Sequence, residues 1–296
     1  MTGCFSELPA QFGAILAVDI DYEHPTTRPF PLEEAPLHFR RLRAWSLPLI
    51  RLLVTWESIA HAGPNPATDL DTEYIDYLRR LIEMMPQYGI KCFVCGHQNV
   101  WSRFTGGSGA PKWAFESAGF DIAALTDTGA AYVHGRHEER RWNQEMNGVI
   151  DPREPSGLCV WPSGYQKLVA STMATLFWAG DALATKLTCH RMPIVSAQSS
   201  ASNHEGEKAQ ESEEGEVVSV QTFLQDAFIE AFGCVADAVG HLEACVGFDP
   251  MNEPHRGLVN CTNSTPGTRG LQIGHSPSLA QSLALGSGYA QKVPFT

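Results

Sequence analysis

Four short apolar runs, separated by segments with helical periodicity, constrain the fold of this chain more than any other feature. The runs are Gly13–Ile20, Leu49–Trp56, Lys91–His97 and Ala244–Asp249. Each run is apolar along its length, with no polar–apolar alternation, which is typical of parallel strands covered on both faces. Strands that alternate with helices predict right-handed βαβ units, and therefore an α/β fold with a parallel sheet.

The segments between these runs carry the apolar faces expected of helices. From Asp71 to Tyr88 the apolar residues recur at helical spacing, and we expect Asp71 to cap this helix and Gly89 to end it. Three further helices are predicted at Leu32–Trp45, with Trp45 on the apolar face, at Ser163–Thr185 and at Val220–Leu242. A doubly wound sheet could stop at four or five strands, whereas a (β/α)8 barrel needs eight, so the pattern alone leaves both architectures open.

The connection from Gln98 to Glu243 is long for a single βα connection, which favours substrate-binding loops plus an insertion. Within it, about residues 196–219 form a low-complexity acidic insert, in which six glutamates lie among Ser, Gly and Gln. Such a stretch cannot bury enough apolar surface to offset its ordering entropy, so we expect a disordered loop there.

Charge and hydropathy exclude several classes of partner. The chain has 296 residues, with 33 acidic and 21 basic side chains, and its net charge of −12 disfavours binding to nucleic acid. No apolar stretch is long enough to cross a membrane. The first ten residues lack the basic and apolar regions of a signal peptide, so we expect an intracellular protein, either cytoplasmic or vacuolar.

The strongest chemical signal is the segment Asp249-Pro250-Met251-Asn252-Glu253-Pro254, which directly follows the fourth apolar run. A carboxyl at the end of a barrel strand projects into the mouth where substrates bind. Glu253 could serve there as a general acid, and the Asn252 amide could hydrogen-bond a sugar hydroxyl. The alternative is an ordinary turn that ends the strand, with Pro254 fixing the backbone.

A second polar group follows the third run, where His97, Gln98 and Trp101 precede the Gly-rich segment Gly106–Gly109. Histidine and glutamine can hydrogen-bond sugar hydroxyls, and aromatic faces pack on sugar C–H surfaces. The alternative is a mobile surface loop. Arg51 is a further candidate, because a charge within an apolar strand is costly unless it is paired. It would form either a structural ion pair or a contact that holds a catalytic carboxylate in place.

Cys92 and Cys95 are the only closely spaced cysteines. A zinc site needs a second such pair, and the sequence has none. We therefore interpret these two cysteines as residues of a buried strand, and we expect neither a metal nor another cofactor. A redox or zinc module remains an alternative that metal analysis would decide.

Together these segments resemble glycoside hydrolase family 5, and within it the fungal steryl-glucosidase and glucosylceramidase-like branch related to endoglycoceramidases. The resemblance runs from about Arg28 to the end, and it is carried by Arg51–Glu57, His61–Pro64, Tyr74–Leu78, Tyr88–Lys91, His97–Pro111 and Asn252–His255. It implies a (β/α)8 TIM barrel, of which residues 1–296 would hold about the first four βα units. It also implies retaining hydrolysis of a β-glucoside carried on a lipid, a steryl β-glucoside or glucosylceramide.

The resemblance also implies roles for individual residues. On the family pattern Glu253 is the acid/base, Asn252 contacts the sugar 2-hydroxyl, and His97 and Arg51 match active-site positions. The family nucleophile is a Glu on the seventh strand, and we expect none in this chain. Glu57 matches a position without a nucleophilic role, although it could face the mouth. We expect the fragment to be inactive alone, and any contact with a membrane to be peripheral.

Two departures from the family pattern bear on these roles. Cys95-Gly96 stands where the family usually has Asp-Pro, and Asn99 stands in place of an Asp. Loss of these carboxylates could loosen the orientation of His97. A non-catalytic protein that binds glycolipid or carbohydrate is therefore the alternative from another functional class.

Overall fold

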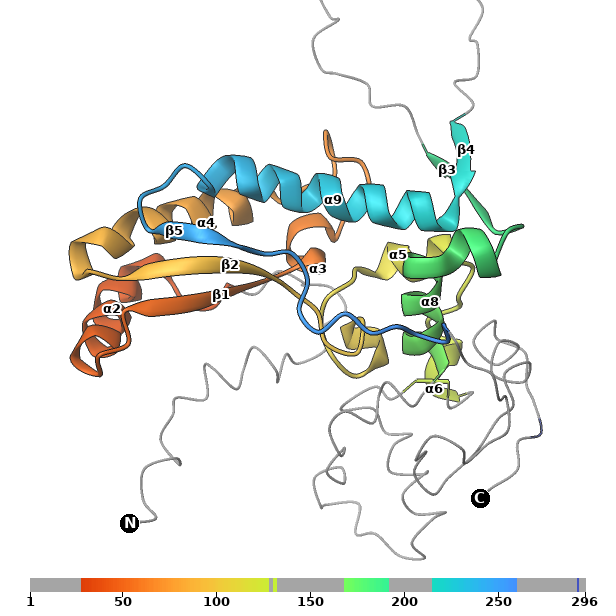
Figure 1. Ribbon diagram of the computed structural model, residues 1–296, viewed down its shortest axis with the longest axis horizontal. Coiled ribbons are helices and arrows are strands. Elements are labelled where there is room, and N and C mark those ends of the chain that lie inside the picture. Colours follow the sequence, from red (N-terminus) through yellow and green to blue (C-terminus); the bar gives the residue numbers. More distant parts are fainter. Residues whose placement is uncertain (1–27, 128–129, 132–167, 192–214, 260–291, 293–296) are drawn as a thin grey trace, which may run out of the picture.

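The structure is a computed structural model that describes residues 28–127, 130–131, 168–191, 215–259 and 292 (Figure 1). Its centre is a parallel sheet with the strand order β1-β2-β5, formed by β1 (Leu49–Thr55), β2 (Lys91–His97) and β5 (Cys245–Asp249). Three of the four predicted strands are thus confirmed. The remaining one, Gly13–Ile20, lies outside the described residues.

The helices that connect these strands match the predicted segments. They are α2 (Ala35–Ala44), preceded by the 3-10 turn η1 (Leu32–Glu34), α4 (Thr72–Met84), followed by η2 (Met85–Tyr88), α8 (Leu168–Leu183) and α9 (Val220–Val239). The Asp71 carboxylate accepts a hydrogen bond from the Tyr74 N–H, as an N-cap should. Gly89 ends the η2 turn with a φ of 63°, a conformation that favours glycine.

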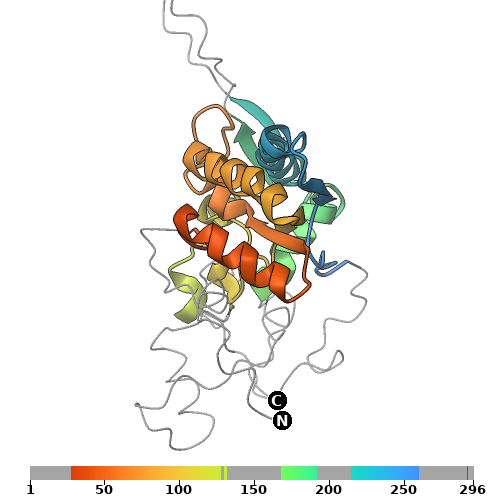
Figure 2. The same ribbon diagram turned by 90° about the vertical axis from the view of Figure 1, so that its left-hand side faces the viewer.

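The helices pack on one side of the sheet, and the strands are not buried equally on both faces. In Figure 2, α2, α4 and α9 follow one another around the strands, and α4 contacts both of the others. Leu52, Val54 and Val94 are buried, whereas the Arg51 and Asp249 side chains are 40% and 35% exposed. On the face opposite the helices Cys95 is buried, but Arg51 and Asp249 are partly exposed, so the two faces are covered unequally in the described residues.

One further expectation about the core is wrong. Trp45 was placed on the apolar face of the first helix, but α2 ends at Ala44 and the Trp45 side chain is 60% exposed. Ala35 and Phe39 are buried as expected. Trp45 follows the last helical residue, so its side chain does not continue the face that Ala35 and Phe39 form.

Part of the acidic insert is ordered, contrary to expectation. Glu216–Ser219 forms strand β4, which pairs in antiparallel register with β3 (Thr188–Arg191). The side chain of Ser219 then caps α9 by accepting from the Thr222 N–H. Only two apolar residues, Val217 and Val218, mark β4 in the sequence. This signal was too short to separate the strand from the acidic insert. Residues 196–214 lie outside the described part of the chain.

Short elements gather at the carboxyl end of the sheet. They are α3 (Trp56–Ala60), η3 (Arg103–Thr105), α5 (Lys112–Ser117) and α6 (Ala124–Asp127). The loops after β1, β2 and β5 all leave the sheet at this end, since the three strands are parallel. Polar residues that follow different strands are thereby brought together, as in a (β/α)8 barrel.

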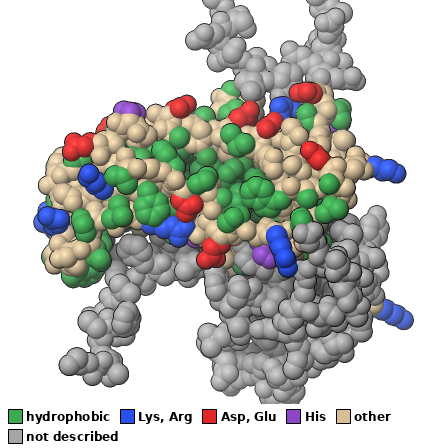
Figure 3. Space-filling view, in the orientation of Figure 1, with side chains coloured by type: hydrophobic (Ala, Val, Ile, Leu, Met, Phe, Trp, Pro, Cys, Tyr) green, Lys and Arg blue, Asp and Glu red, His purple; other side chains and the backbone are tan. Residues whose placement is uncertain are grey.

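The face of the molecule in Figure 3 carries many hydrophobic side chains. On β5, Val246 and Phe248 are 53% and 46% exposed. Among the described strands β5 pairs only with β2, so one of its edges has no partner within the described part of the chain. Such an edge is prone to pair with another strand.

Candidate active site

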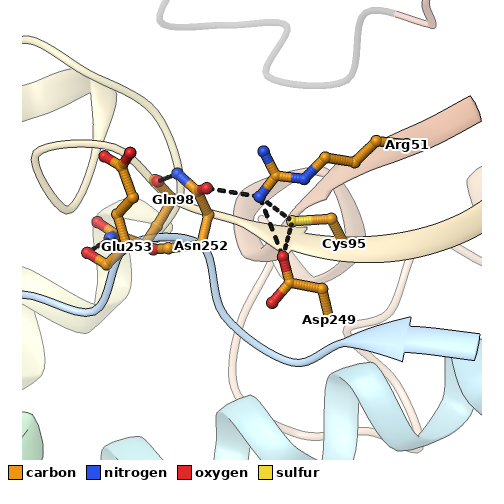
Figure 4. Close-up of polar contacts among 6 residues, drawn as sticks. All are labelled: Arg51, Cys95, Gln98, Asp249, Asn252 and Glu253. Carbon is orange, nitrogen blue, oxygen red and sulfur yellow. Dashed lines mark hydrogen bonds and ion pairs between the residues drawn. The ribbon is translucent and has the colours of Figure 1, made fainter.

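The guanidinium of Arg51 is the centre of a polar cluster on the face of the sheet opposite the helices (Figure 4). Its Nη2 donates to Asn252 Oδ1 at 2.5 Å, to Asp249 Oδ2 at 3.0 Å and to Cys95 Sγ at 3.1 Å. The register explains this convergence. Leu53 lies opposite Cys95 and Cys95 opposite Asp249, and Arg51 shares the face of Leu53 because it is two residues away.

Charge and hydrogen bonding fix the protonation of this cluster. The Cys95 thiol donates to Asp249 Oδ2 at 3.2 Å. This hydrogen bond, together with Arg51, lowers the pKa of Asp249. Burial, reinforced by the Asp249 carboxylate, raises the pKa of Cys95 to about 11, so the thiol stays protonated and remains a donor. Arg51 forms an ion pair with Asp249, as the structural alternative expected, and it also holds the amide of Asn252, the residue before Glu253.

The Asn252 side chain is fixed in orientation. Its Oδ1 accepts from Arg51, its Nδ2 donates to the Gln98 carbonyl at 2.9 Å, and only 8% of the residue is exposed. Its backbone N–H donates to the carbonyl of Gly96 at 2.9 Å. One Nδ2–H beyond the bond to Gln98 remains for a ligand, because a primary amide has two N–H donors.

Gly96 permits this close approach of two loops. A Cβ on Gly96 would lie 2.4 Å from the carbonyl oxygen of Pro250, a distance that real Cβ atoms do not adopt. The Cys95-Gly96 pair, noted above as a departure from the family pattern, therefore supplies both a donor to Asp249 and the space for the Asn252 turn. Sequence reasoning missed both roles, because neither is visible without the register of β2 and β5.

Glu253 lies at the carboxyl end of β5, and its side chain is exposed. In Figure 4 its carboxylate points away from the Arg51 cluster, while its backbone lies against Gln98. Its φ of 41° is in the left-handed region, which is uncommon for a residue other than glycine. Glu253 presents an exposed carboxylate beside the fixed Asn252 amide, and the described residues provide no ion-pair partner for it.

His97 ends β2, and its ring is partly buried. Burial, with a further contribution from the Arg51 charge, lowers the pKa of His97, whereas the charges of Glu253 and Asp249 act in the opposite direction. The imidazole is therefore neutral at neutral pH. Its Nδ1 is buried, and no hydrogen-bond partner for it lies within the described residues.

Gln98 and Trp101, predicted to bind the substrate, are both buried, at 8% and 5% exposure. The Gln98 amide contacts backbone groups, and the Trp101 indole packs edge-on against Phe177 with ring centroids 5.6 Å apart. The segment that follows is not a mobile loop. Ser102 Oγ donates to the Ala110 carbonyl, and Asn99 and Ser108 form a backbone bridge.

Glu57 does not face an open mouth, contrary to the possibility raised from the sequence. It is 6% exposed, and its two carboxylate oxygens accept from Arg103 Nε at 2.8 and 3.0 Å. Its backbone N–H donates to the Gly109 carbonyl at 2.7 Å. Glu57 and Arg103 therefore anchor the Gly-rich loop to α3, a pairing that no spacing in the sequence indicated.

No protein-family model matches the chain. Curated relatives do: a glucosylceramidase of Rhizopus delemar is 46% identical over 90% of this chain, and an ergosteryl-beta-glucosidase of Saccharomyces cerevisiae is 32% identical over 91% of it. The chain spans about a third of the length of these relatives, 33% of each.

Solved structures agree with these relatives. The chain superposes on Cryptococcus neoformans sterylglucosidase 1 with a TM-score of 0.65 and 34% identity, covering 88% of this chain and 32% of that one. The expected fold class, an α/β chain that forms part of a (β/α)8 barrel, is confirmed by this match together with the parallel sheet. Within the described residues no helix is both long and apolar enough to cross a membrane.

Proposed function

We propose that the chain forms part of a retaining β-glucosidase of glycoside hydrolase family 5 that acts on a glycolipid, because it is similar to fungal glucosylceramidases and to a fungal sterylglucosidase. One observation carries this proposal. An exposed carboxylate, Glu253, stands next to a fixed amide, Asn252, at the end of a parallel sheet where barrel enzymes bind substrates.

In the proposed reaction Glu253 is the general acid. It donates a proton to the glycosidic oxygen as the bond from the sugar carbon breaks, and the aglycone leaves as an alcohol. A second carboxylate attacks the sugar carbon and forms a glycosyl-enzyme. Glu253 then removes a proton from water, which attacks the same carbon and releases glucose with its configuration retained.

The other site residues support Glu253 in this proposal. Asn252 has one amide N–H beyond its bond to Gln98, which suits a hydrogen bond to a sugar hydroxyl. Arg51 holds the amide oxygen, so that the N–H cannot turn away. His97, neutral because burial lowers its pKa, can donate to or accept from a hydroxyl without adding charge.

The nucleophile is proposed to lie outside the described residues. Asp249 is paired with Arg51, and Glu57 is paired with Arg103, so neither carboxylate is free to attack a sugar. The relatives are about three times as long as this chain, and we expect residues 1–296 alone to hydrolyse aryl β-glucosides negligibly. The substrate is proposed to be a steryl β-glucoside or glucosylceramide, reached through peripheral contact with a membrane. A non-catalytic glycolipid-binding protein remains the second candidate, favoured by the pairing of Asp249 with Arg51 and of Glu57 with Arg103.

The test compares kcat/KM of variants with that of the wild type. It uses the whole protein, including any sequence that the transcript encodes beyond Thr296. We expect Glu253→Gln to lower kcat/KM for steryl β-glucoside at least 10²-fold, since general acid catalysis contributes roughly that much. The matched control is Glu243→Gln, a change at an exposed carboxylate just before β5, which should leave kcat/KM unchanged. Undiminished turnover by Glu253→Gln would refute the assignment, and glycolipid binding without turnover would favour the second candidate.

A further inference from the structure

The turn that carries Glu253 is held in an unfavourable conformation. Glu253 has a φ of 41°, and it precedes Pro254, which restricts the backbone of the preceding residue to extended conformations. A non-glycine residue that is left-handed before a proline goes against both preferences. Such a conformation persists only where surrounding contacts enforce it.

Gln98 supplies these contacts from the end of β2. Its Nε2 donates to the carbonyl of Asn252 at 2.6 Å and to the carbonyl of Glu253 at 2.9 Å. Its Oε1 accepts from the backbone N–H of Trp101 at 3.0 Å. A flipped amide would direct an oxygen at two carbonyl oxygens, so the orientation is set by its partners.

The two hydrogen bonds reach the residues on which the chemistry depends. Both N–H groups of one buried side chain are spent on the backbone of the acid and of its neighbour (Figure 4). The Gln98 carbonyl also accepts from Asn252 Nδ2 at 2.9 Å. Gln98 thus contacts the backbone of both residues and the side chain of Asn252, and its amide oxygen and nitrogen both bond to backbone groups.

We propose that Gln98 is a positioning residue that fixes the backbone of Asn252 and Glu253 and thereby aims the Glu253 carboxylate at the glycosidic oxygen. This inference rests on the proposed function of Glu253. It replaces the role of sugar binding that was expected for Gln98 from the sequence. Because the bonds hold the acid and not the sugar, their loss should slow proton transfer and leave substrate affinity largely unchanged.

Gln98→Glu is the most selective variant. The introduced carboxyl keeps the size of glutamine and an oxygen that can accept from Trp101, but when ionised it loses both donors to the turn. We expect kcat for steryl β-glucoside to fall about 10- to 100-fold, as for a misplaced catalytic group, with KM changed less than 3-fold. An activated aryl β-glucoside, whose phenol leaves without a proton, should lose far less in kcat/KM, which reports the step that forms the glycosyl-enzyme.

The ratio of kcat/KM for the steryl substrate to kcat/KM for the aryl substrate separates positioning from a structural role. If Gln98 only stabilised the fold, both substrates would lose activity in proportion to the folded fraction, and the ratio would stay at the wild-type value. Lowering the pH should partly restore the ratio in Gln98→Glu, because the protonated carboxyl can donate to one carbonyl. Gln98→Met, which lacks both donors at every pH, should show no such recovery.

Gln87→Met is the matched control, since Gln87 is exposed on the η2 turn, and it should behave as wild type. If Gln98→Glu fails to fold, the same ratio is measured in Gln98→Met. An unchanged ratio in the folded variant overturns the positioning role. If Glu253→Gln itself retains full activity, the proposed function fails instead, so the two failures are distinguishable.

Discussion

Two arginine–carboxylate pairs lie near the carboxyl end of the sheet, and they differ in burial. Arg51 and Asp249 are 40% and 35% exposed, and Arg51 also holds the Asn252 amide. Arg103 and Glu57 are only 11% and 9% exposed, and Arg103 contacts both oxygens of one carboxylate. The first pair lies beside the candidate acid, whereas the second fastens the Gly-rich loop to α3.

The pKa values of the two carboxylates are shifted in opposite directions, by hydrogen bonds at Asp249 and by burial at Glu57. Hydrogen bonds from Cys95 and Arg51 lower the pKa of Asp249. Burial raises the pKa of Glu57 to about 7, although Arg103 opposes this rise. The partly exposed Arg51–Asp249 pair keeps Asp249 ionised beside the site. The buried Arg103–Glu57 pair stabilises the loop on which the site is built. The same residue types therefore have different functions.

The largest expected effect comes from breaking the buried pair. Arg103→Met should lower the free energy of unfolding by about 3–5 kcal/mol at pH 8, because it leaves the ionised Glu57 buried without a partner. The loss should be smaller at pH 5, where Glu57 is protonated. Urea unfolding at both pH values measures this. Arg79→Met, at an exposed pair with Glu83, is the control and should change the free energy of unfolding far less, because solvent screens that pair. Equal losses in the two variants would contradict the comparison.

The pH dependence of Glu57 is the next effect in size. Its folded pKa of about 7 lies above the ordinary 4.5, so the folded state holds a proton that the unfolded state has lost between these values. The contribution of this group to stability is therefore complete below about pH 4.5 and is lost as the pH rises through about 7, by up to about 3 kcal/mol. Glu57→Gln should remove this slope from the unfolding free energy measured between pH 4.5 and 7.5. Glu83→Gln should retain it, and a slope that persists in Glu57→Gln would be the contrary result.

The smallest effect on stability is expected at the partly exposed Arg51–Asp249 pair. Arg51→Met should cost about 1 kcal/mol or less, since a partly exposed ion pair is screened by solvent. It should nevertheless raise the pKa of Asp249 toward its ordinary value, because a donor and a positive charge are removed. Carboxyl-selective NMR titration would follow this change. An Asp249 pKa that stays low in Arg51→Met would mean that Cys95 alone sets it.

The sequence predicted the elements of the fold better than the contacts of the site. Apolar runs and helical periodicity located β1, β2, β5 and α4, together with the Asp71 cap and the turn at Gly89. These are local patterns, so a single sequence carries them. The short strand β4 was missed because four residues give too little periodicity.

The sequence predicted which residues belong to the candidate site, but it did not predict which of them form hydrogen bonds or ion pairs with one another. Arg51 and Asn252 do meet, but the Asp249 carboxylate and the Cys95 thiol join them through a register that no local pattern encodes. Gln98 was expected to bind sugar because its residue type can do so. The structure turns its amide to the backbone, which depends on a contact between loops about 150 residues apart in the sequence.

The role of Glu253 as the acid/base is tested most directly by its dependence on the leaving group. In the whole protein, Glu253→Ala should impair hydrolysis of steryl β-glucoside far more than hydrolysis of an activated aryl β-glucoside, since only the first needs a proton to leave. Added azide should partly restore turnover of the aryl substrate, because a small anion attacks the glycosyl-enzyme without a general base. If both substrates lose activity equally and azide restores neither, Glu253 only ends a strand and the assignment of the site is wrong.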